Sequence, residues 1–336
     1  MRAVKLFSPA VVQQNPLSLV SVDVPEPAAG QVRIKINYCG VCHTDLHIVE
    51  GDIHPPQLPI TPGHQVVGVI DAIGPSQAEV GLRAGQRVGV PWLHWTDGTC
   101  AFCDSGSENL CERAKFTGFH VDGGYADYMI AESQYVLPLP QQIQSMDAAP
   151  LLCAGIVGFR SLRKAGLVHG ERLGLFGFGA SAHLAIQVAR SWGCEVYVFT
   201  RSASHRKHAE KLGAAWVGGA EDKPPKLLDR AVVFAPAGKI VPLALEKIRA
   251  GGTVALNAIH MSDIPQMPYS LIYGERSLVS VANATYQDGL DFLELAAEIP
   301  IKVTRVPYKL ENANRALADM KHSRINGEAV LEINSD

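Results

Sequence analysis

The sequence predicts an α/β protein with two domains, one β-rich and one built on a doubly wound parallel sheet. Its 336 residues are about two domains' worth at ~150 residues each. Up to about residue 145, short strand-like runs are punctuated by Pro and Gly, which is typical of a many-stranded β domain. From about Met146 onward, strands alternate with helices, which is the pattern of a parallel sheet with helical crossovers.

Three strands stand out in the β-rich part. Residues 32–38 alternate between apolar and polar side chains and break at Gly40, and residues 65–73 form a run that Gly74 and Pro75 close. Residues 87–90 form a third, shorter strand.

The second part predicts a βαβαβ arrangement. Its strands are expected at residues 172–176, 196–200, 231–234 and 253–256, and its helices at 182–192, 204–212 and 243–250. Gly193 and Gly213 end the first two helices. A further helix at 287–298 and strand-like pieces such as 301–306 follow, and we assign this last part of the chain to the first domain.

Composition excludes several classes of partner. Apolar residues make up 47% of the chain, charged residues make up 19%, and the formal net charge is −3. No basic block or long apolar run stands out, so we expect neither a nucleic-acid partner nor a membrane span. The N-terminus lacks the pattern of a signal peptide, so we expect a cytoplasmic protein with reduced thiols.

The cysteines favour metal binding over disulfides. There are seven, an odd number, and three of them fall within twelve residues. They are Cys39, Cys42, Cys100, Cys103, Cys111, Cys153 and Cys194.

The Cys39-x-x-Cys42 pair by itself has three interpretations. It is one buried cysteine with an incidental neighbour, a thioredoxin-like redox pair, or part of a metal site. The redox interpretation expects a small βαβ domain, which this β-rich part is not. Together with His64 and Cys153, Cys42 completes a Cys₂His set, one of the known ligand sets of catalytic zinc.

A glycine-rich turn predicts a dinucleotide site. Gly177, Gly179 and Ala182 form a G-x-G-x-x-A motif after the strand at 172–176 and at the start of the next helix. The two glycines permit a tight turn and close approach of a pyrophosphate, and alanine is tolerated at the third position.

Six segments, in order along the chain, carry a resemblance to a known family. They are YCGVCHTDLHIVEGD (38–52), PGHQVVGVI (62–70), GVPWLHW (89–95), GSENLC (106–111), DGGYADY (122–128) and APLLCAGIVGFRSL (149–162). Together they resemble the zinc-dependent alcohol dehydrogenases of the medium-chain dehydrogenase/reductase family. The resemblance implies a GroES-like catalytic domain at residues 1–146 and 286–336, a Rossmann nicotinamide-dinucleotide domain at 147–285, and an active site in the cleft between them.

The resemblance also implies the reaction and the residues of the catalytic centre. It implies hydride transfer between a small alcohol or aldehyde and NAD(P), through an alkoxide on a zinc held by Cys42, His64 and Cys153. Asp45 would orient His64, although its residue type also suits a loop cap.

Proton removal and cofactor contact are implied for the same segment. Thr44 would begin a proton relay and His47 would end it, whereas as bare residues they suit a turn and the surface. His43 would lie near the cofactor pyrophosphate. Trp92 and Phe116 are pocket candidates by resemblance, and by themselves they suit a core equally well.

The family's structural zinc uses four cysteines spaced C-x₂-C-x₂-C-x₇-C. Here the same frame holds Asp97, Cys100, Cys103 and Cys111, so the first ligand is a carboxylate, which zinc accepts. His94 is close enough in sequence to substitute for it. We favour a retained zinc over a lobe that has lost its metal, because three surface-loop thiols without a function are an oxidation liability.

The end of the second strand of the alternating part favours NADP(H), with NAD(H) as the alternative. An NAD site would place an acid there to bind the ribose diol, whereas this chain has Thr200, Arg201 and Ser202. Ser204, Arg206 and Lys207 follow, and the whole set suits a 2′-phosphate, although the last two also suit a solvated helix face.

Three departures from the family pattern bear on activity. Gln65 stands where a glutamate is usual, Glu328 stands where an arginine meets the cofactor, and Val157 stands where threonine is common. Gln65 deletes a negative charge near the metal, and Glu328 near a pyrophosphate would be repulsive.

The departures leave two alternatives beside the alcohol dehydrogenase. One is a reductase for bulkier or unsaturated carbonyls, and the other is a non-catalytic dinucleotide-binding sensor with a drifted site. Residues 277–282 resemble the family's dimer-forming edge, so we expect a homodimer or homotetramer.

Overall fold

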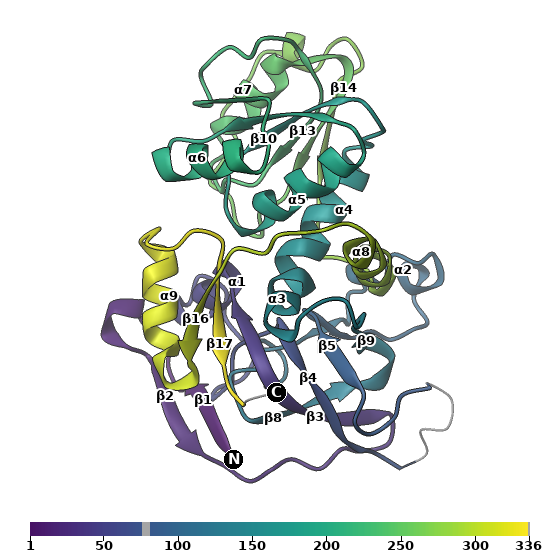
Figure 1. The fold of residues 1–336 in the computed structure, drawn as a ribbon, viewed down its shortest axis with the longest axis vertical. Coiled ribbons are helices and arrows are strands. Elements are labelled where there is room, and N and C mark those ends of the chain that lie inside the picture. Colours follow the sequence, from purple (N-terminus) through teal and green to yellow (C-terminus); the bar gives the residue numbers. More distant parts are fainter. Residues whose placement is uncertain (76–80, 335–336) are drawn as a thin grey trace. The chain divides into compact units, whose positions relative to one another are not determined.

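The computed structural model describes residues 1–75 and 81–334 (Figure 1). The chain forms two compact units, which are described separately below. The first unit comprises Met1–Cys153, Thr285–Ala297 and Val303–Asp336, and the second comprises Ala154–Ala284 and Glu298–Lys302.

The first unit is built on a seven-stranded sheet with β3 near its centre. Within the sheet the order is β16-β17-β3-β4-β5-β9, and β8 also pairs with β3. The strands are β3 (Gln31–Val41), β4 (Val66–Ile73), β5 (Arg87–Val90), β8 (Tyr128–Glu132), β9 (Leu137–Pro138), β16 (Arg305–Lys309) and β17 (Glu328–Glu332). Val32, Ile34 and Ile36 alternate along β3 and are fully buried, so the predicted period-two pattern fills the core of this unit.

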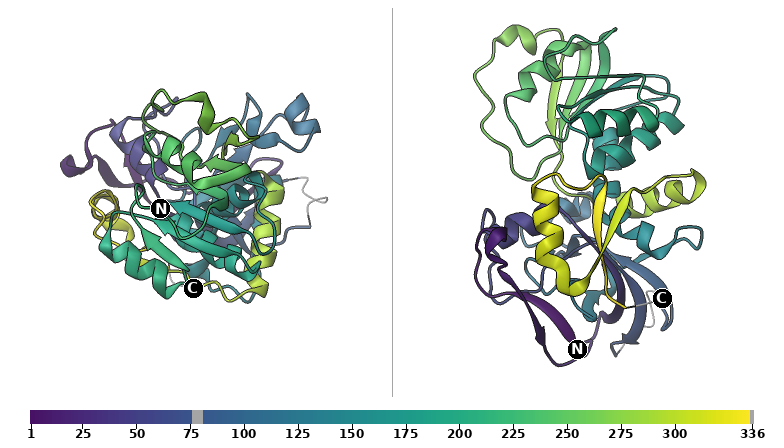
Figure 2. Two further views of the ribbon diagram at one scale, coloured as in Figure 1. Left: turned by 90° about the horizontal axis from the view of Figure 1, so that it is seen from above. Right: turned by 60° about the vertical axis from the view of Figure 1, so that its left-hand side comes forward.

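Smaller elements surround this sheet. Two-stranded ladders join β1 (Arg2–Leu6) to β2 (Leu17–Ser21) and β6 (Leu93–Trp95) to β7 (Lys115–Phe116). The helices of the unit are α1 (His43–Glu50), α2 (Ala101–Asp104), α3 (Ser145–Pro150), α8 (Tyr286–Glu298) and α9 (Ala313–Lys321). Helix α9 packs beside β16 and β17, as the yellow elements of Figure 2 show. Short 3₁₀ turns occur at Val12–Gln14, Glu108–Leu110, Ser133–Tyr135 and Leu310–Asn312.

The second unit is a six-stranded parallel sheet in the order β12-β11-β10-β13-β14-β15. Numbered from β10, this is the 3-2-1-4-5-6 order of dinucleotide-binding sheets. The strands are β10 (Arg172–Phe176), β11 (Glu195–Phe199), β12 (Trp216–Gly218), β13 (Leu228–Val233), β14 (Ile248–Leu256) and β15 (Ser277–Ser280). The helices are α4 (Ile156–Lys164), α5 (Ala180–Ser191), α6 (Ala203–Lys211) and α7 (Ile240–Lys247), and a 3₁₀ turn lies at Tyr269–Leu271. The teal helices α5 and α6 cover one face of the sheet and α7 covers the other (Figure 2).

The α/β fold class with a β-rich unit and a doubly wound parallel sheet is therefore confirmed. Three details differ from the sequence-based expectations. Residues 301–304 lie outside the strands, and β16 begins only at Arg305. The helix expected over 243–250 ends at Lys247, because β14 begins at Ile248. Helices α1, α2, α3, α4 and α9 were not predicted, and each of them has fewer than ten residues.

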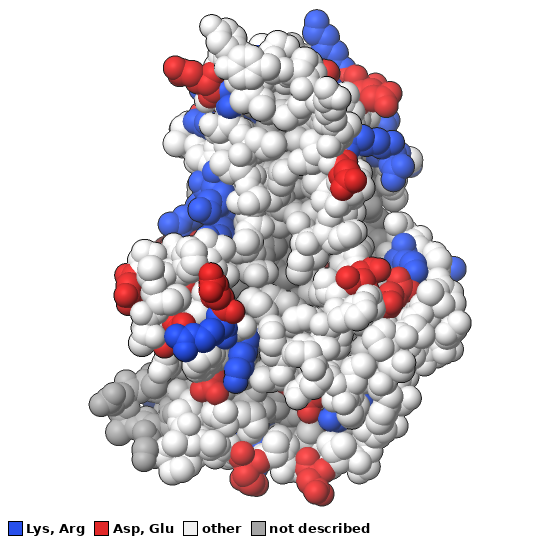
Figure 3. All heavy atoms as spheres, turned by 180° about the vertical axis from the view of Figure 1, so that it is seen from behind, with Lys and Arg blue, Asp and Glu red and all other residues white. Residues whose placement is uncertain are grey.

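Among the helices that the structure describes, none combines the length and the apolar character needed to cross a bilayer. On the face drawn in Figure 3, Lys and Arg side chains are interspersed with Asp and Glu side chains.

Candidate functional site

The Cys42 thiol is held at the N-terminus of α1. Its Sγ accepts a hydrogen bond from the Thr44 backbone N–H at 3.3 Å. In return the Asp45 carboxylate accepts a hydrogen bond from the Cys42 backbone N–H at 3.0 Å, which completes a capping box. The CHTD segment therefore forms a helix start, and this geometry fixes the direction of the thiol.

The Asp45 carboxylate organises the centre of the site. It is fully buried, and it accepts hydrogen bonds from the Gly63 N–H at 3.2 Å and from the Tyr125 hydroxyl at 3.2 Å. It also lies 3.0 Å from Nδ1 of His64. Since Nδ1 faces Asp45, the other ring nitrogen, Nε2, faces Cys42 at 3.3 Å from Sγ. Tyr125 was not singled out from the sequence, although it lies in the DGGYADY segment.

Cys153 completes a group of three potential metal ligands. It lies in a π-helical segment, Leu151–Gly155, that joins α3 to α4. The ligand atoms of Cys42, His64 and Cys153 all lie within 4.8 Å of one another. Ligands at 2.0–2.3 Å from a tetrahedral ion stand about 3.5 Å apart, so this thiol–thiol–imidazole set fits zinc in spacing and in chemistry.

The pKa values of these groups indicate that a metal would have to displace protons from them. A hydrogen bond with Cys153, and then burial, raise the pKa of Cys42 well above its ordinary value. Burial lowers the pKa of His64, but Cys42 and Asp45 outweigh it, so that this pKa is raised. Because a metal binds the deprotonated ligands, its affinity for this set rises with pH.

Asp45→Asn is expected to lower the zinc affinity of this set about 10- to 100-fold. The carboxamide keeps the size of the side chain but replaces one acceptor oxygen with a donor. The interaction that orients the His64 ring is therefore weakened. Zinc content after dialysis against graded chelator measures the effect. Asp52→Asn serves as the control, because Asp52 is half exposed and its carboxylate contacts His47 instead. Equal zinc affinity in Asp45→Asn and wild type would contradict the role of Asp45.

The other predicted residues of this segment lie along α1. Thr44 is in its first turn, and His47 is one turn further along the same face. Nδ1 of His47 lies 2.7 Å from the Asp52 carboxylate, a partner that the sequence did not indicate. His43 is the first residue of the helix and is exposed.

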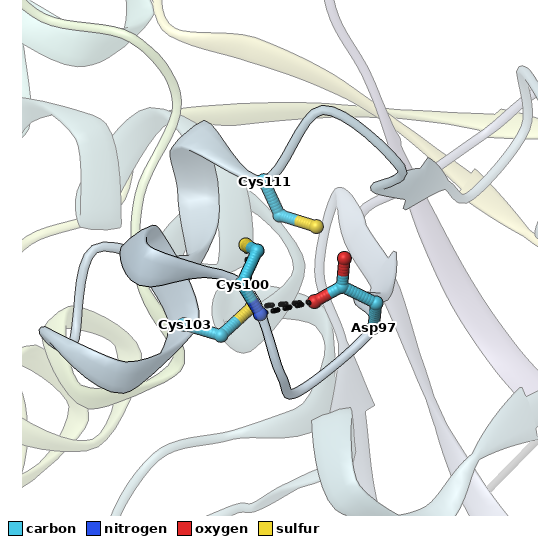
Figure 4. A group of neighbouring side chains, drawn as sticks. All are labelled: Asp97, Cys100, Cys103 and Cys111. Carbon is cyan, nitrogen blue, oxygen red and sulfur yellow. Dashed lines mark hydrogen bonds between the residues drawn. The ribbon is translucent and has the colours of Figure 1, made fainter.

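A second group of ligands lies in the loop around α2. Figure 4 shows the side chains of Asp97, Cys100, Cys103 and Cys111 pointing toward one another. Their ligand atoms lie within 4.8 Å, so the structure brings together all four residues that the spacing predicted. Cys100 and Cys103 are 3.6 Å apart at sulfur, and Cys103 is 3.4 Å from the Asp97 carboxylate.

The Asp97 carboxylate is well ordered by its neighbours. One oxygen accepts the backbone N–H groups of Thr99 and Cys100 at 2.9 and 3.0 Å, and these bonds hold its pKa well below the ordinary value. The other oxygen accepts from Arg113 at 2.9 Å. His94 is not a member of the group. Burial, with smaller effects of Lys115 and His120, lowers the pKa of His94 to about 4, and its Nε2 lies 4.0 Å from Glu132.

The glycine-rich turn lies between β10 and α5, as the motif predicted. Gly177 has φ +93°, and a Cβ there would lie 2.9 Å from the Ala235 backbone nitrogen, so both conformation and space require glycine. A Cβ at Gly179 would meet nothing within 4 Å, which leaves the N-terminus of α5 open to an incoming group. Ala182 is fully buried in α5.

The residues after β11 lie at the start of α6. The Thr200 N–H donates to Gly218 at 2.7 Å, and Ser202 caps α6 by accepting the His205 N–H at 3.3 Å. Arg201 is exposed. The Arg206 guanidinium is anchored nearby, because its Nε donates to the Thr200 carbonyl at 2.9 Å.

Two departures from the family pattern meet in the first unit. Gln65 and Glu328 are 0% and 2% exposed, and an ideal Cβ at Gly40 would lie 2.9 Å from atoms of both. The expectation that Glu328 faces a pyrophosphate is corrected accordingly, because its carboxyl turns into the interior. Val157, in α4, accepts a hydrogen bond from Asn257 through its carbonyl at 3.3 Å.

An aromatic cluster adjoins His64. The Trp92 ring contacts the His64 ring edge to face at 4.8 Å and stacks on Phe116 at 5.1 Å. Phe119 lies 6.0 Å from Trp92 and adds to the same cluster. The two pocket candidates thus lie together beside one of the three potential ligands.

Comparisons with families and curated proteins cover most of the chain. The family described as "Alcohol dehydrogenase GroES-like domain" matches residues 28–141, and the family described as "Zinc-binding dehydrogenase" matches residues 182–298. The "Probable alcohol dehydrogenase AdhA" of Mycobacterium tuberculosis is 43% identical over 340 residues, which cover 99% of this chain and 97% of that protein. An "Alcohol dehydrogenase" of Geobacillus stearothermophilus is 35% identical, with 96% and 99% covered.

A comparison with solved structures agrees on the fold. The structure described as CAD from Helicobacter pylori complexed with NADP(H) aligns with a TM-score of 0.88 at 20% identity, over 98% of this chain and 97% of that one.

Proposed function

The chain belongs to the zinc-type alcohol dehydrogenases of the medium-chain dehydrogenase/reductase family, and from that membership we propose which of its residues carry out hydride transfer between a small alcohol or aldehyde and a nicotinamide cofactor. We propose a catalytic domain of residues 1–146 and 286–336 and a dinucleotide-binding domain of residues 147–285, whereas the compact units of the structure divide after Cys153.

The observation that carries this proposal is the convergence of Cys42, His64 and Cys153 with Asp45 behind the imidazole. Cys42, His64 and Cys153 would hold the zinc, because catalytic zinc sites use three protein ligands of these types. Bound there, zinc supplies Lewis-acid polarisation of the alcohol or carbonyl oxygen. The capping box at α1 and the Asp45 hydrogen bonds hold the ligands in place before any metal or substrate arrives.

We assign the removal of the alcohol proton to Thr44 and His47. They lie one turn apart on α1, so the Thr44 hydroxyl would accept the proton of the alcohol and His47 would release it to solvent. The carboxylate of Asp52 orients the His47 ring through Nδ1 and leaves Nε2 to take the proton. His43 is assigned to the pyrophosphate.

For the second metal group, we propose a structural zinc bound by Asp97, Cys100, Cys103 and Cys111. The reduced thiols that both clusters need are maintained in the cytoplasm, so we propose a cytoplasmic enzyme.

We propose NADP(H) as the preferred cofactor, bound at Gly177, Gly179 and Ala182 and at Thr200, Arg201 and Ser202. The open N-terminus of α5 suits the pyrophosphate, and the exposed Arg201 at the start of α6 suits a 2′-phosphate.

Arg201→Ala is expected to lower kcat/KM for NADP(H) about 10- to 100-fold, which corresponds to one lost charge-assisted contact to a phosphate. The value for NAD(H) should change little, because that cofactor lacks the phosphate. Steady-state assays with both cofactors measure the ratio, and Lys211→Ala, an exposed cation at the other end of α6, is the control. An equal fall for both cofactors would contradict the assignment.

We propose a homodimer or homotetramer in which β15 meets its counterpart in a second copy. This strand pairs only with β14 in the described sheet, so one of its edges is unpaired. Tyr269 and Tyr273, shortly before it in sequence, are 74% and 70% exposed. Light scattering after gel filtration should give at least twice the 36.1 kDa of one chain. A single-chain mass would contradict this proposal.

The proposed activity is tested by assays with primary, secondary and aromatic alcohols and aldehydes, each with NADP(H) and NAD(H), before and after chelator treatment. Turnover that chelation abolishes and zinc restores supports the catalytic zinc. No turnover by protein that still binds a dinucleotide would overturn the enzyme assignment in favour of the sensor.

A further inference from the structure

A buried polar pair lies beside the catalytic ligand set, outside the residues assigned above. It consists of Gln65, which precedes β4, and Glu328, the first residue of β17. Among the described residues, none of the four terminal polar atoms of the two side chains makes a hydrogen bond of regular geometry to a third group, although all four are shielded from solvent. Buried polar groups without partners are unfavourable, so such a pair at a functional site calls for a cause.

Gly40 creates the space that the pair occupies. It lies in β3, directly opposite Val330 of β17, and its backbone N–H donates to the Gln65 carbonyl at 2.9 Å. A Cβ at this position would lie 2.9 Å from Cδ of Gln65 and 2.9 Å from Oε1 of Glu328. A side chain at position 40 would therefore displace the pair.

The two side chains are attached close to two of the three ligands. Gln65 directly follows His64 in the chain. Ala329 pairs with Val41 in the ladder between β17 and β3, so Glu328 lies next to the end of the ladder from which Cys42 continues, and its carboxyl is near enough for the charge of Cys42 to affect it. A strand near the C-terminus, β17, therefore places this carboxyl beside the group of potential metal ligands.

The electrostatic surroundings indicate what could stabilise this carboxyl. Burial, followed by the negative charge of Cys42, raises the pKa of Glu328 well above its ordinary value, whereas contact with the Gln65 side chain and the charge of His64 act in the opposite direction. Among the described residues, no Lys or Arg forms an ion pair with Glu328. A divalent cation on the neighbouring ligands would supply the missing positive charge.

We propose that Glu328 is a positioning residue of the catalytic metal. Its carboxylate occupies the space left by Gly40 and supplies a negative charge beside the ligands. The neutral Gln65, which directly follows His64, does not supply that charge. This inference rests on the proposed catalytic zinc. Compared with the family pattern, the carboxyl side chain near the metal therefore comes from β17 and not from the position after His64. Zinc retention then depends on β17.

The test is zinc release from the zinc-loaded, full-length protein to a chromogenic chelator at fixed pH. Glu328→Gln, which is nearly isosteric, is expected to weaken zinc binding at this site about 10- to 100-fold. The exchange variant Gln65→Glu/Glu328→Gln returns the charge to the same space and is expected to restore the affinity. Glu332→Gln changes an exposed carboxylate on the same strand and serves as the matched control. Cys153→Ala identifies the release phase that belongs to this site.

The outcomes separate this inference from the proposed function. If the Cys153→Ala variant holds as much zinc as the wild type, the catalytic zinc itself is overturned. If wild type loses one zinc on that substitution but Glu328→Gln holds zinc as tightly as wild type, only the role of Glu328 is overturned. Weakened binding that the exchange variant does not restore would indicate a packing role and would likewise overturn the inference. Thermal melting of each variant checks that it is folded, and the exchange variant still tests the charge if Glu328→Gln does not fold.

Discussion

Replacing Cys153 by alanine is expected to lower kcat/KM for alcohol oxidation by about 1000-fold or more and to remove one zinc per chain. The substitution removes one of the three potential ligands whose atoms lie within 4.8 Å of one another. Lewis-acid stabilisation of the developing charge is worth several kcal/mol, and each ~1.4 kcal/mol is a factor of ten in rate. Zinc content by elemental analysis and steady-state kinetics measure the two effects.

Cys194→Ala is the matched control for this substitution. Cys194 is also a free cysteine, but it is buried in the second unit, where its thiol donates to the Val168 carbonyl at 3.4 Å. We expect this variant to keep full zinc content and activity. Dinucleotide binding by Cys153→Ala, followed by fluorescence, confirms that its other unit is intact. Full activity in Cys153→Ala would contradict the ligand assignment.

Replacing Asp97 by alanine is expected to remove the second zinc and to lower the melting temperature by about 5–10 °C. A metal held by residues 97 and 111 cross-links the loop, so its loss returns conformational freedom to the unfolded chain, as the loss of a disulfide does. Asp97→Cys, which supplies a fourth thiolate, is expected to hold zinc at least as tightly as wild type. Calorimetry and zinc content measure both variants.

Asp104→Ala tests whether the effect belongs to the metal group. Asp104 is an exposed carboxylate in the same loop and lies outside the group of four. It should leave zinc content and melting temperature unchanged. The alternative of a lobe that has lost its metal makes the opposite prediction for Asp97→Ala, namely one zinc per chain in wild type and variant alike.

The local periodicity of the sequence was enough to predict most of the fold. Alternation along β3 and the β-α alternation after Met146 are local patterns, so the two kinds of sheet were identified correctly. Helix α1 was missed, because the residues that begin it were interpreted for their chemistry and not as a capping box. The strand expected at 301–306 was misplaced, because regular pairing begins only at Arg305, although the Thr304 carbonyl already accepts from the Glu328 N–H.

The grouping of the metal ligands was also predictable, for a different reason. The resemblance to the family indicated the members of both candidate groups, and in the structure the ligand atoms of each group lie within 4.8 Å of one another. The partners behind those ligands were harder to find. Tyr125 contacts Asp45 from 80 residues away, and Asp52 contacts His47 through a turn after α1. Single tyrosine and aspartate residues give no signal of their own in a sequence.

What the sequence by itself determined is therefore the α/β class and the main elements of the alternating part, since these depend on local patterns, while its resemblance to the family indicated the members of both candidate metal groups. What only the tertiary structure decided is the position of Glu328. Its sequence position suggested a group facing the cofactor, but the antiparallel pairing of β17 with β3 turns the carboxyl inward. There the missing side chain of Gly40 lets it meet Gln65. Strand register sets which face each side chain occupies, and register is a property of the assembled sheet.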